Sequence, residues 1–218
     1  MSRQENLLER LKHPEDRFTE RKPKGVSTED KCKTLVAFAN SLPDGEEGIL
    51  FIGVSDKGDI LGLDNTDNLQ KEMRKLAEQR CYPPIRIQSE VLNISGLEVV
   101  AVSVLPSRNR PHFTGPAYVR IGSESCEATE QMLTELIASR TDEGRLLLKY
   151  RDEQTEILVE HGLPQHSQRM RCFVAECDSH FVGFKTMAGG GIFRLPLKRL
   201  SISWENSQRK PLITEQVG

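Results

Sequence analysis

The sequence predicts an α+β fold, in which a mixed sheet of about five strands carries packed helices and is followed by a small C-terminal β-rich appendage. Up to about residue 160, apolar runs of strand length alternate with segments that repeat apolar residues at helical spacing. Further on, short apolar runs are separated by glycine, proline and polar residues. We therefore expect a core domain over residues 1–145, a helical connector over 146–164 and a small basic β-rich region over 165–218.

The first elements are a helix, an extended segment and a second helix. Residues 4–12 carry leucines at helical spacing, and Pro14 disfavours helical angles at the residue before it. Residues 15–27 are polar and contain a proline and a glycine, so we expect an extended segment followed by a loop. Thr28 offers a hydroxyl cap with acids in the following turn, and this helix should stop near Ser41.

Strands and a third helix complete the expected core. Residues 48–54 are continuously apolar, and residues 60–63 should return after a turn as the second strand of a β-hairpin. Residues 66–80 repeat apolar side chains at helical spacing and end before two prolines. The remaining expected elements are strands over 85–92, 97–104 and 117–121, then a mostly helical stretch from 128 to about 161 with a break near Gly144.

The C-terminal region differs from the core in pattern and in charge. Residues 172–204 contain short strands separated by turn residues, which indicates a small β-barrel or an added sheet. Residues 165–210 hold eight lysines and arginines against three acids, in a chain whose net charge is −2. Such a surface fits either a polyanion or a solvated basic face. Lys185, Lys198 and Arg199 are the candidate nucleic-acid-binding residues of this region.

Composition narrows the cellular setting. No apolar run approaches the roughly 20 residues that span a bilayer. The polar start lacks the apolar core of a signal peptide, and the odd number of cysteines, five, does not indicate a disulfide framework. We therefore expect a cytoplasmic protein with no membrane partner. Because the net charge is close to zero, only local patches can argue for nucleic acid.

Three acids and a lysine lie where a fold can bring them together. Glu15 and Glu20 are in the polar extended segment, and Asp56 follows the apolar strand over 48–54. Lys22 shares a face with Glu20 if that segment is a strand. Carboxylates are the hard oxygen ligands of Mg²⁺ or Mn²⁺, and an ammonium neutralises charge on phosphate. The residues alone also fit ordinary surface acids, with Asp56 favouring a turn.

Five motifs in order then indicate a family. They are Glu15 with Glu20-Arg21-Lys22, Ala37-Phe38-Ala39-Asn40, Gly53-Val54-Ser55-Asp56, Arg110-Pro111 and Tyr118-Val119-Arg120-Ile121-Gly122-Ser123. Over about residues 5–140 the chain resembles the Schlafen AlbA-like (divergent AlbA, AAA-4-associated) domain, the core of Schlafen nucleases. It departs from the family pattern in two places. Arg21 stands where the pattern has phenylalanine, and a longer acidic loop over 42–48 replaces a short Gly-Gly turn.

The resemblance implies a site and an activity. In Schlafen endoribonucleases two glutamates and an aspartate form the acidic catalytic cluster, and these positions correspond to Glu15, Glu20 and Asp56. It therefore implies that these three residues are catalytic and hold Mg²⁺ or Mn²⁺, with Lys22 assisting. We expect a metal-dependent endonuclease that acts on structured RNA such as tRNA in preference to DNA, and a homodimer that offers two sites.

Two alternatives remain open. Many bacterial relatives are described as DNA-binding regulators, so the same fold is compatible with a non-catalytic DNA- or RNA-binding module. The near-neutral charge also permits a protein-interaction domain. Arg120 belongs to the candidate nucleic-acid-binding residues, because an arginine there either contacts phosphate or pairs with an acid.

Overall fold

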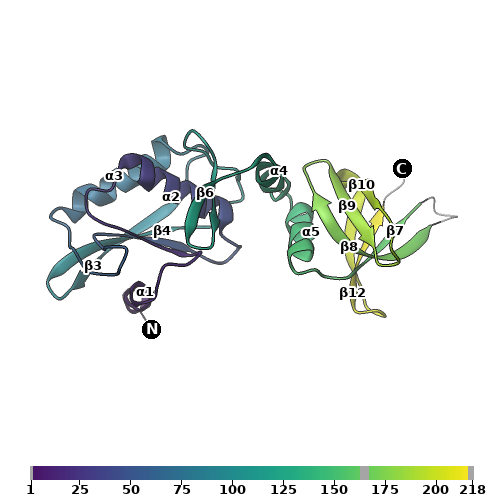
Figure 1. The fold of residues 1–218 in the computed structure, drawn as a ribbon, viewed down its shortest axis with the longest axis horizontal. Helices are drawn as coiled ribbons and strands as arrows, with labels where there is room; N and C mark the ends of the chain where they lie inside the picture. Colours follow the sequence, from purple (N-terminus) through teal and green to yellow (C-terminus); the bar gives the residue numbers. More distant parts are fainter. Residues whose placement is uncertain (1, 163–166, 216–218) are drawn as a thin grey trace. The chain divides into compact units, whose positions relative to one another are not determined.

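The protein folds as two compact units that meet in sequence between Thr129 and Glu130 (Figure 1). The structure, a computed structural model, describes residues 2–162 and 167–215. Both units mix helices with strands, and the second is the more β-rich, as the sequence predicts. Within the described residues, no helix is both long and apolar enough to cross a membrane.

A four-stranded mixed sheet with the order β1-β2-β4-β3 forms the centre of the first unit. Strand β1 (Thr19–Lys22) runs parallel to β2 (Gly48–Ile52), and β2 runs antiparallel to β4 (Leu97–Val104). Strand β3 (Ile87–Ile94) forms the far edge beside β4. All five residues of β2 are buried, which explains why this strand is a continuous apolar run in the sequence.

Helices cover both faces of this sheet. Helices α2 (Thr28–Ser41) and α3 (Thr66–Gln79) pack on one face, against Leu50 and Ile52 of β2. Helix α1 (Arg3–Lys12) packs on the other face, where its leucines meet Ile49 and Phe51. Successive side chains of a strand point to opposite faces, so β2 supplies both layers of the core. Figure 1 shows α1 on the opposite side of the sheet from α2 and α3.

A two-stranded hairpin of β5 (Tyr118–Ile121) and β6 (Glu124–Glu127) packs beside α2. Asn40, near the end of α2, joins the helix to this hairpin. Its Nδ2 donates to the carbonyl oxygens of Tyr118 at 2.9 Å and His112 at 3.0 Å, and its Oδ1 accepts from the His112 amide at 2.7 Å. Asn40 is therefore a buried structural residue that fixes where β5 lies.

The second unit places two helices against a six-stranded sheet. Helix α5 packs on the sheet, where Leu147 joins a core with Val174 and Phe184. The sheet order is β10-β9-β8-β7-β12-β11, with β7 and β12 parallel and the other pairs antiparallel. The elements are α4 (Glu130–Ala138), α5 (Asp142–Asp152), β7 (Ile157–His161), β8 (Gln168–Cys177), β9 (Phe181–Thr186), β10 (Ile192–Pro196), the 3₁₀ helix η1 (Leu197–Arg199), β11 (Leu200–Glu205) and β12 (Lys210–Glu215).

The predicted hairpin of residues 48–54 with 60–63 is wrong. Residues 60–63 form no strand, and only a single bridge joins Val54 to Ile60. The amides of Leu61 and Gly62 both donate to the carbonyl of Gly53, which has a φ of 100°. This tight closure keeps the returning chain out of the sheet, and β4 occupies the position beside β2.

The expected helical stretch from 128 to 161 also differs from the structure. The break falls before Thr141, whose Oγ1 accepts from the amide of Gly144 and caps α5, so Gly144 lies in the first turn of the helix. Residues 157–161 form β7 and not helix. The expected connector over 146–164 supplies Leu147 and Ile157 to the core of the second unit. Its described residues, 146–162, are therefore part of that unit, which begins at residue 130 and not after 145, and residues 163–164 lie outside the described residues.

Candidate active site

Strand β1 holds Glu20 and Lys22 on one side of the sheet edge. The two residues are two apart in an extended strand, so their side chains point the same way. Lys22 Nζ lies 2.7 Å from Glu20 Oε1. Glu20 is 7% exposed, so this ion pair is shielded from solvent on the carboxylate side.

Arg120 binds the other oxygen of Glu20. Its Nη1 donates to Glu20 Oε2 at 2.5 Å, and its Nη2 donates to the Asp16 carbonyl oxygen at 2.7 Å. The guanidinium carbon lies 4.8 Å from the centre of the Phe38 ring, and the side chain is 1% exposed. Of the two roles expected for Arg120, the structure shows the ion pair with an acid. A side chain this deeply buried does not reach a nucleic-acid backbone, so we no longer count Arg120 among the candidate nucleic-acid-binding residues.

Glu15 lies close enough to Glu20, Lys22 and Asp56 for their charges to affect its pKa. Its Oε1 accepts a hydrogen bond of 2.6 Å from the Arg21 amide. Burial raises the pKa of Glu15, and the charges of Glu20 and Asp56 raise it further. The Arg21 hydrogen bond and the charge of Lys22 oppose this rise but do not cancel it.

Lys22 remains a cation in this setting. Burial alone would lower the pKa of its ammonium. The hydrogen bond and charge of Glu20, with the charges of Glu15 and Asp56, outweigh burial and raise the pKa above the ordinary value. Lys22 is therefore protonated at neutral pH and can face a negatively charged group.

Asp56 joins the cluster because β1 and β2 are parallel. The carboxyl ends of parallel strands meet at one edge, and here the amides of Gly53 and Val54 donate to the Lys22 carbonyl at 2.9 and 3.2 Å. Asp56 follows in an exposed turn closed by the Gly58 amide, which donates to the Ser55 carbonyl. Asp56 is therefore close enough to Glu15 and Lys22 for its charge to affect their pKa values.

Arg21 is a structural residue of this site that the sequence showed only as a departure from a motif. It is 5% exposed, and its Nη2 donates to the carbonyl oxygens of Leu11, at 2.7 Å, and of His13. A Cβ at Gly58 would lie 3.2 Å from Arg21 Nη1, so the guanidinium also lies under the turn of Asp56. Arg21 therefore connects the end of α1 to that turn.

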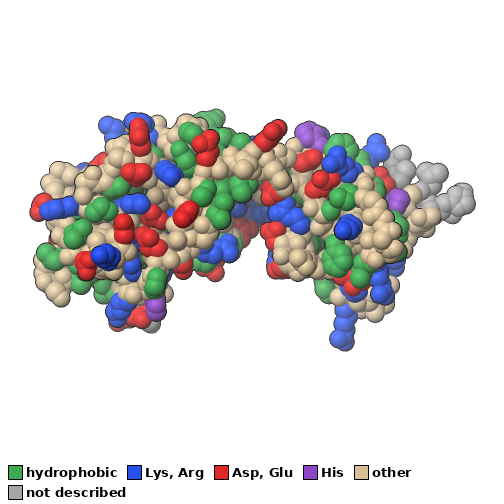
Figure 2. Space-filling model, in the orientation of Figure 1, with side chains coloured by type: hydrophobic (Ala, Val, Ile, Leu, Met, Phe, Trp, Pro, Cys, Tyr) green, Lys and Arg blue, Asp and Glu red, His purple; other side chains and the backbone are tan. Residues whose placement is uncertain are grey.

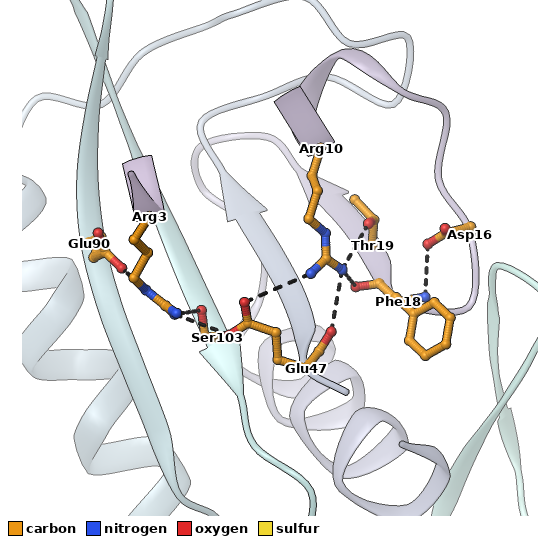
Figure 3. Close-up of polar contacts among 8 residues, drawn as sticks. All are labelled: Arg3, Arg10, Asp16, Phe18, Thr19, Glu47, Glu90 and Ser103. Atoms are coloured by element: carbon orange, nitrogen blue, oxygen red, sulfur yellow. Dashed lines mark hydrogen bonds and ion pairs between the residues drawn. The ribbon is translucent and has the colours of Figure 1, made fainter. Parts of the chain in front are cut away.

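A second network fastens α1 to the sheet (Figure 3). Arg3 Nη2 donates to Ser103 Oγ at 2.8 Å and to Glu47 Oε2 at 3.1 Å, and Arg3 Nε pairs with Glu90. Arg10 Nη2 donates to the carbonyl oxygens of Phe18 at 2.9 Å and Glu47 at 3.3 Å. Glu47, from the acidic loop before β2, is thus bound by α1.

Glu20 and Lys22 open onto a cavity of about 280 Å³, which we call the Glu20 cavity. The first turns of α2 and the β5–β6 hairpin provide its other walls. Its remaining lining residues are Asp30, Lys33, Thr34, Glu124 and Ser125. Sequence reasoning missed these five, because they lie outside the family motifs and carry ordinary surface side chains.

The predicted basic residues of the second unit are exposed but do not form one cluster. Lys185 lies near one end of β9, where it pairs with Ile192 of β10. Lys198 and Arg199 lie in η1, which directly follows Pro196 of β10. Pro196 pairs with Phe181 at the other end of β9. At about 3.3 Å per residue, these ends are about 13 Å apart. Figure 2 shows basic and acidic side chains interspersed on the visible face of each unit.

The three carboxylates do not form a ready metal site as they lie. Both oxygens of Glu20 are bound by cations, and one oxygen of Glu15 accepts from a backbone amide. Over residues 2–162 and 167–215, no group of three or more His, Cys, Asp or Glu side chains is placed to hold a metal ion. The present arrangement therefore does not fit Mg²⁺ or Mn²⁺, and binding at Glu15, Glu20 and Asp56 stays a prediction.

Comparison with solved structures finds similar domains. One is the solution structure of the N-terminal domain of a protein from Nitrosomonas europaea described as related to the ATP-dependent DNA helicase RecG. It is 25% identical, with a TM-score of 0.43, over 59% of this chain and 95% of that one. Another is the DIP2311 protein from Corynebacterium diphtheriae, 16% identical with a TM-score of 0.42, over 57% of this chain and 28% of that one. No curated protein matches the sequence.

The family comparison covers the part of the chain that forms the site. The model of the Schlafen AlbA_2 family matches residues 15–129, more than half of the sequence. That span includes Glu15, Glu20 and Asp56. It also includes Arg120 of β5, which binds Glu20. It begins after α1 and ends at Thr129, where the first unit ends. The chain therefore belongs to the Schlafen AlbA_2 family.

Proposed function

We propose that the first unit binds nucleic acid at the cluster of Glu15, Glu20, Lys22 and Asp56 and cleaves its phosphodiester backbone, with structured RNA such as tRNA as the preferred substrate. Membership of the Schlafen AlbA_2 family gives the chain a nucleic-acid-related function. One observation carries the finer proposal. Two parallel strands bring these four residues within electrostatic reach of one another, beside an open polar cavity.

The chemistry that these side chains offer is proton transfer with charge stabilisation. A carboxylate whose pKa is raised keeps its proton to a higher pH than an ordinary glutamate, and this suits Glu15 to accept or donate a proton. The protonated Lys22 can stabilise the negative charge that grows on a phosphate during cleavage. Glu20, fixed between Lys22 and Arg120, orients the lysine.

A requirement for Mg²⁺ or Mn²⁺ belongs to the proposal, and it rests on the family resemblance. Such an ion would supply a Lewis acid at the phosphate. The carboxylates as placed do not offer it a ligand set, because Glu20 would first have to release Lys22 or Arg120. The roles proposed for Glu15 and Lys22 therefore do not involve the ion.

The homodimer implied by the resemblance is also part of the proposal, and light scattering of the purified chain would measure it.

The first prediction is that purified protein cleaves labelled tRNA faster than duplex DNA. The comparison uses Mn²⁺, Mg²⁺ and EDTA in parallel, and cleavage should require one of the ions. Glu20→Gln, Lys22→Met and Asp56→Asn should each reduce the rate about 100-fold or more, because each removes a charge from the reacting centre.

Asp59→Asn is the matched control for Asp56→Asn. Asp59 lies in the same turn, but its Oδ2 accepts from Ser55 Oγ at 3.0 Å and serves the turn itself. This variant should keep nearly full cleavage. Cleavage that persists in Glu20→Gln and Asp56→Asn would refute the site, and cleavage in EDTA would refute the metal requirement.

A non-catalytic nucleic-acid-binding module is the second candidate. The observation that favours it is the double ion pair of Glu20, which leaves this carboxylate neutralised on both oxygens. In that case the protein binds RNA or DNA with salt-dependent affinity, and no substrate is cut under any metal condition. The same assay with a binding readout therefore separates the two candidates.

A further inference from the structure

The Glu20 cavity contains polar groups that the cleavage chemistry does not use. Glu20 and Lys22 form one wall, and the opposite walls come from α2 and from β6. Lys33 and Thr34 of α2, with Ser125 of β6, face the same space. A cavity this size, about 280 Å³, is open to a small charged group beside the proposed reacting centre.

Lys33 is a cation held in place without an acidic partner. Its Nζ lies 5.4 Å from the centre of the Tyr118 ring, which orients the long side chain by a cation–π contact. Among the described residues, no carboxylate lies within ion-pair distance of this ammonium. In contrast, the neighbouring Lys31 pairs with Glu72 at 2.8 Å. Lys33 therefore has a charge available to a ligand.

Thr34 adds a hydroxyl to the wall of the cavity. The residue is 2% exposed and lines the cavity, and within the described part of the chain its hydroxyl makes no hydrogen bond. Ser125 Oγ accepts from Arg120 Nη1 at 3.2 Å, so its own proton is free to be donated into the cavity. A hydroxyl that lines a cavity and makes no hydrogen bond within the protein is available to a ligand in that cavity.

Two lysines and three carboxylates line the cavity, and the carboxylates differ in how far they are neutralised. Glu20 is neutralised by Lys22 and Arg120. Asp30 accepts from Ser27 Oγ at 2.8 Å and lies in the first turn of α2, where the helix dipole favours a negative charge. Glu124 is exposed, lines the cavity, and has no ion-pair partner among the described residues. Asp30 and Glu124 are therefore the two lining carboxylates that oppose an anion.

We propose that Lys33, Thr34 and Ser125 bind a backbone phosphate of the nucleic-acid strand, next to the phosphate that faces Lys22. This inference rests on the proposed function and names a second contact of the same site. An ammonium and two hydroxyl donors match the oxygens of a phosphate group. Glu124, at the rim, weakens this contact by its charge.

Binding of a labelled single-stranded RNA, measured by fluorescence anisotropy over a series of salt concentrations, tests the proposal. Lys33→Gln should weaken binding about threefold to tenfold at low salt and reduce the salt slope by about 0.7, the value for one phosphate contact on a single strand. Thr34→Val should weaken binding without changing the slope, because it removes a neutral donor. Glu124→Gln should strengthen binding.

Lys75→Gln is the control, because Lys75 is an exposed lysine of α3 that does not line the cavity. It should leave affinity and slope unchanged. An unchanged salt slope in Lys33→Gln, with RNA binding intact in the wild type, would overturn the phosphate contact and leave the proposed function standing. A wild-type chain that binds no RNA or DNA would overturn both. Opposite effects of Lys33→Gln and Glu124→Gln would not arise from a folding defect.

A second arm separates a strand phosphate from a free anion. Inorganic phosphate is titrated into wild-type protein and into Lys33→Gln while amide NMR shifts of α2 are followed. We expect weak, unsaturated shifts in the wild type, because a single anion lacks the neighbouring contacts of a strand. Tight saturation that is lost in Lys33→Gln would assign the cavity to a free phosphate ion and overturn the strand assignment.

Discussion

Arg120 is the single residue on which the candidate site depends most. Its guanidinium joins Glu20 Oε2, the Asp16 carbonyl and the Phe38 ring, which come from segments far apart in sequence. A buried ion pair adds little stability over an apolar pair, but the loss of one partner leaves the other charge in poorly solvated surroundings. Arg120, in the motif over residues 118–123, is thus the structural partner of Glu20 in the first motif.

Arg120→Met should lower the free energy of unfolding of the first unit by about 3 kcal/mol. Glu20 would then keep only Lys22 as a partner, and two backbone carbonyls would lose a donor. Urea unfolding followed by circular dichroism measures this loss. Arg86→Met, at an exposed arginine, is the matched control and should change stability by less than about 0.5 kcal/mol.

A double variant sharpens this prediction. Glu20→Leu combined with Arg120→Met replaces the ion pair by apolar side chains and should recover most of the lost stability. If Arg120→Met alone costs less than about 1 kcal/mol, Arg120 is not the buried partner described here.

Among the elements, α1 stands out because it lies before residue 15, where the family match begins, and is nevertheless tied to the site. Arg3 and Arg10 bind Glu47 from the helix itself (Figure 3). Arg21, from β1, binds the carbonyls at the end of α1 and lies beside Gly58. The replacement of the family's phenylalanine by Arg21 therefore fits the presence of this helix, whose last carbonyls need donors.

Arg21→Met should loosen both ends of this connection. The carbonyls of Leu11 and His13 would lose their donor, at a cost of about 2 kcal/mol. Amide hydrogen exchange, read by mass spectrometry, should become faster in the last turn of α1 and in residues 55–59, and should not change in α3. Arg74→Met, at an exposed arginine of α3, provides the control. Unchanged exchange in both segments would show that Arg21 does not join them.

For the whole molecule, the notable property is that each unit has its own apolar core. The first contains Leu50, Phe38 and Val102, and the second contains Phe184, Val174 and Ile213. Separate cores allow separate unfolding transitions. The only tryptophan, Trp204, lies in β11 and so reports on the second unit.

Two core substitutions should therefore act on different transitions. Leu50→Ala should cost the first unit about 3 kcal/mol, and Phe184→Ala should cost the second about 4 kcal/mol, because both side chains are fully buried. Trp204 fluorescence during urea unfolding should shift in Phe184→Ala and stay unchanged in Leu50→Ala. An equal shift in both variants would mean that the chain unfolds as one cooperative body.

Helices were the most predictable part of the fold. The helix expected from Thr28 to near Ser41 was found with these bounds, but Ser27 and not Thr28 caps it. The helix expected over 66–80 ended one residue earlier. Helices were predictable because apolar spacing is a local property. Strand pairing was less predictable. The apolar run over 48–54 identifies a buried strand, but nothing in it says that the partner is β4 and not the adjacent residues 60–63. Pairing partners far apart in sequence are selected by the packing of the whole sheet.

The sequence by itself determined the family of the first unit, because the order of its motifs carries the family pattern without coordinates. It also predicted one site for Glu15, Glu20, Lys22 and Asp56. Only the tertiary structure decided that Arg120 pairs with Glu20, that Arg21 fastens α1, and that Lys33 and Thr34 face the Glu20 cavity. The physical reason is that an arginine, lysine or threonine suits solvent, phosphate or a buried partner equally well. Its role depends on which groups lie within hydrogen-bond reach, and contacts between segments that are far apart in sequence determine this.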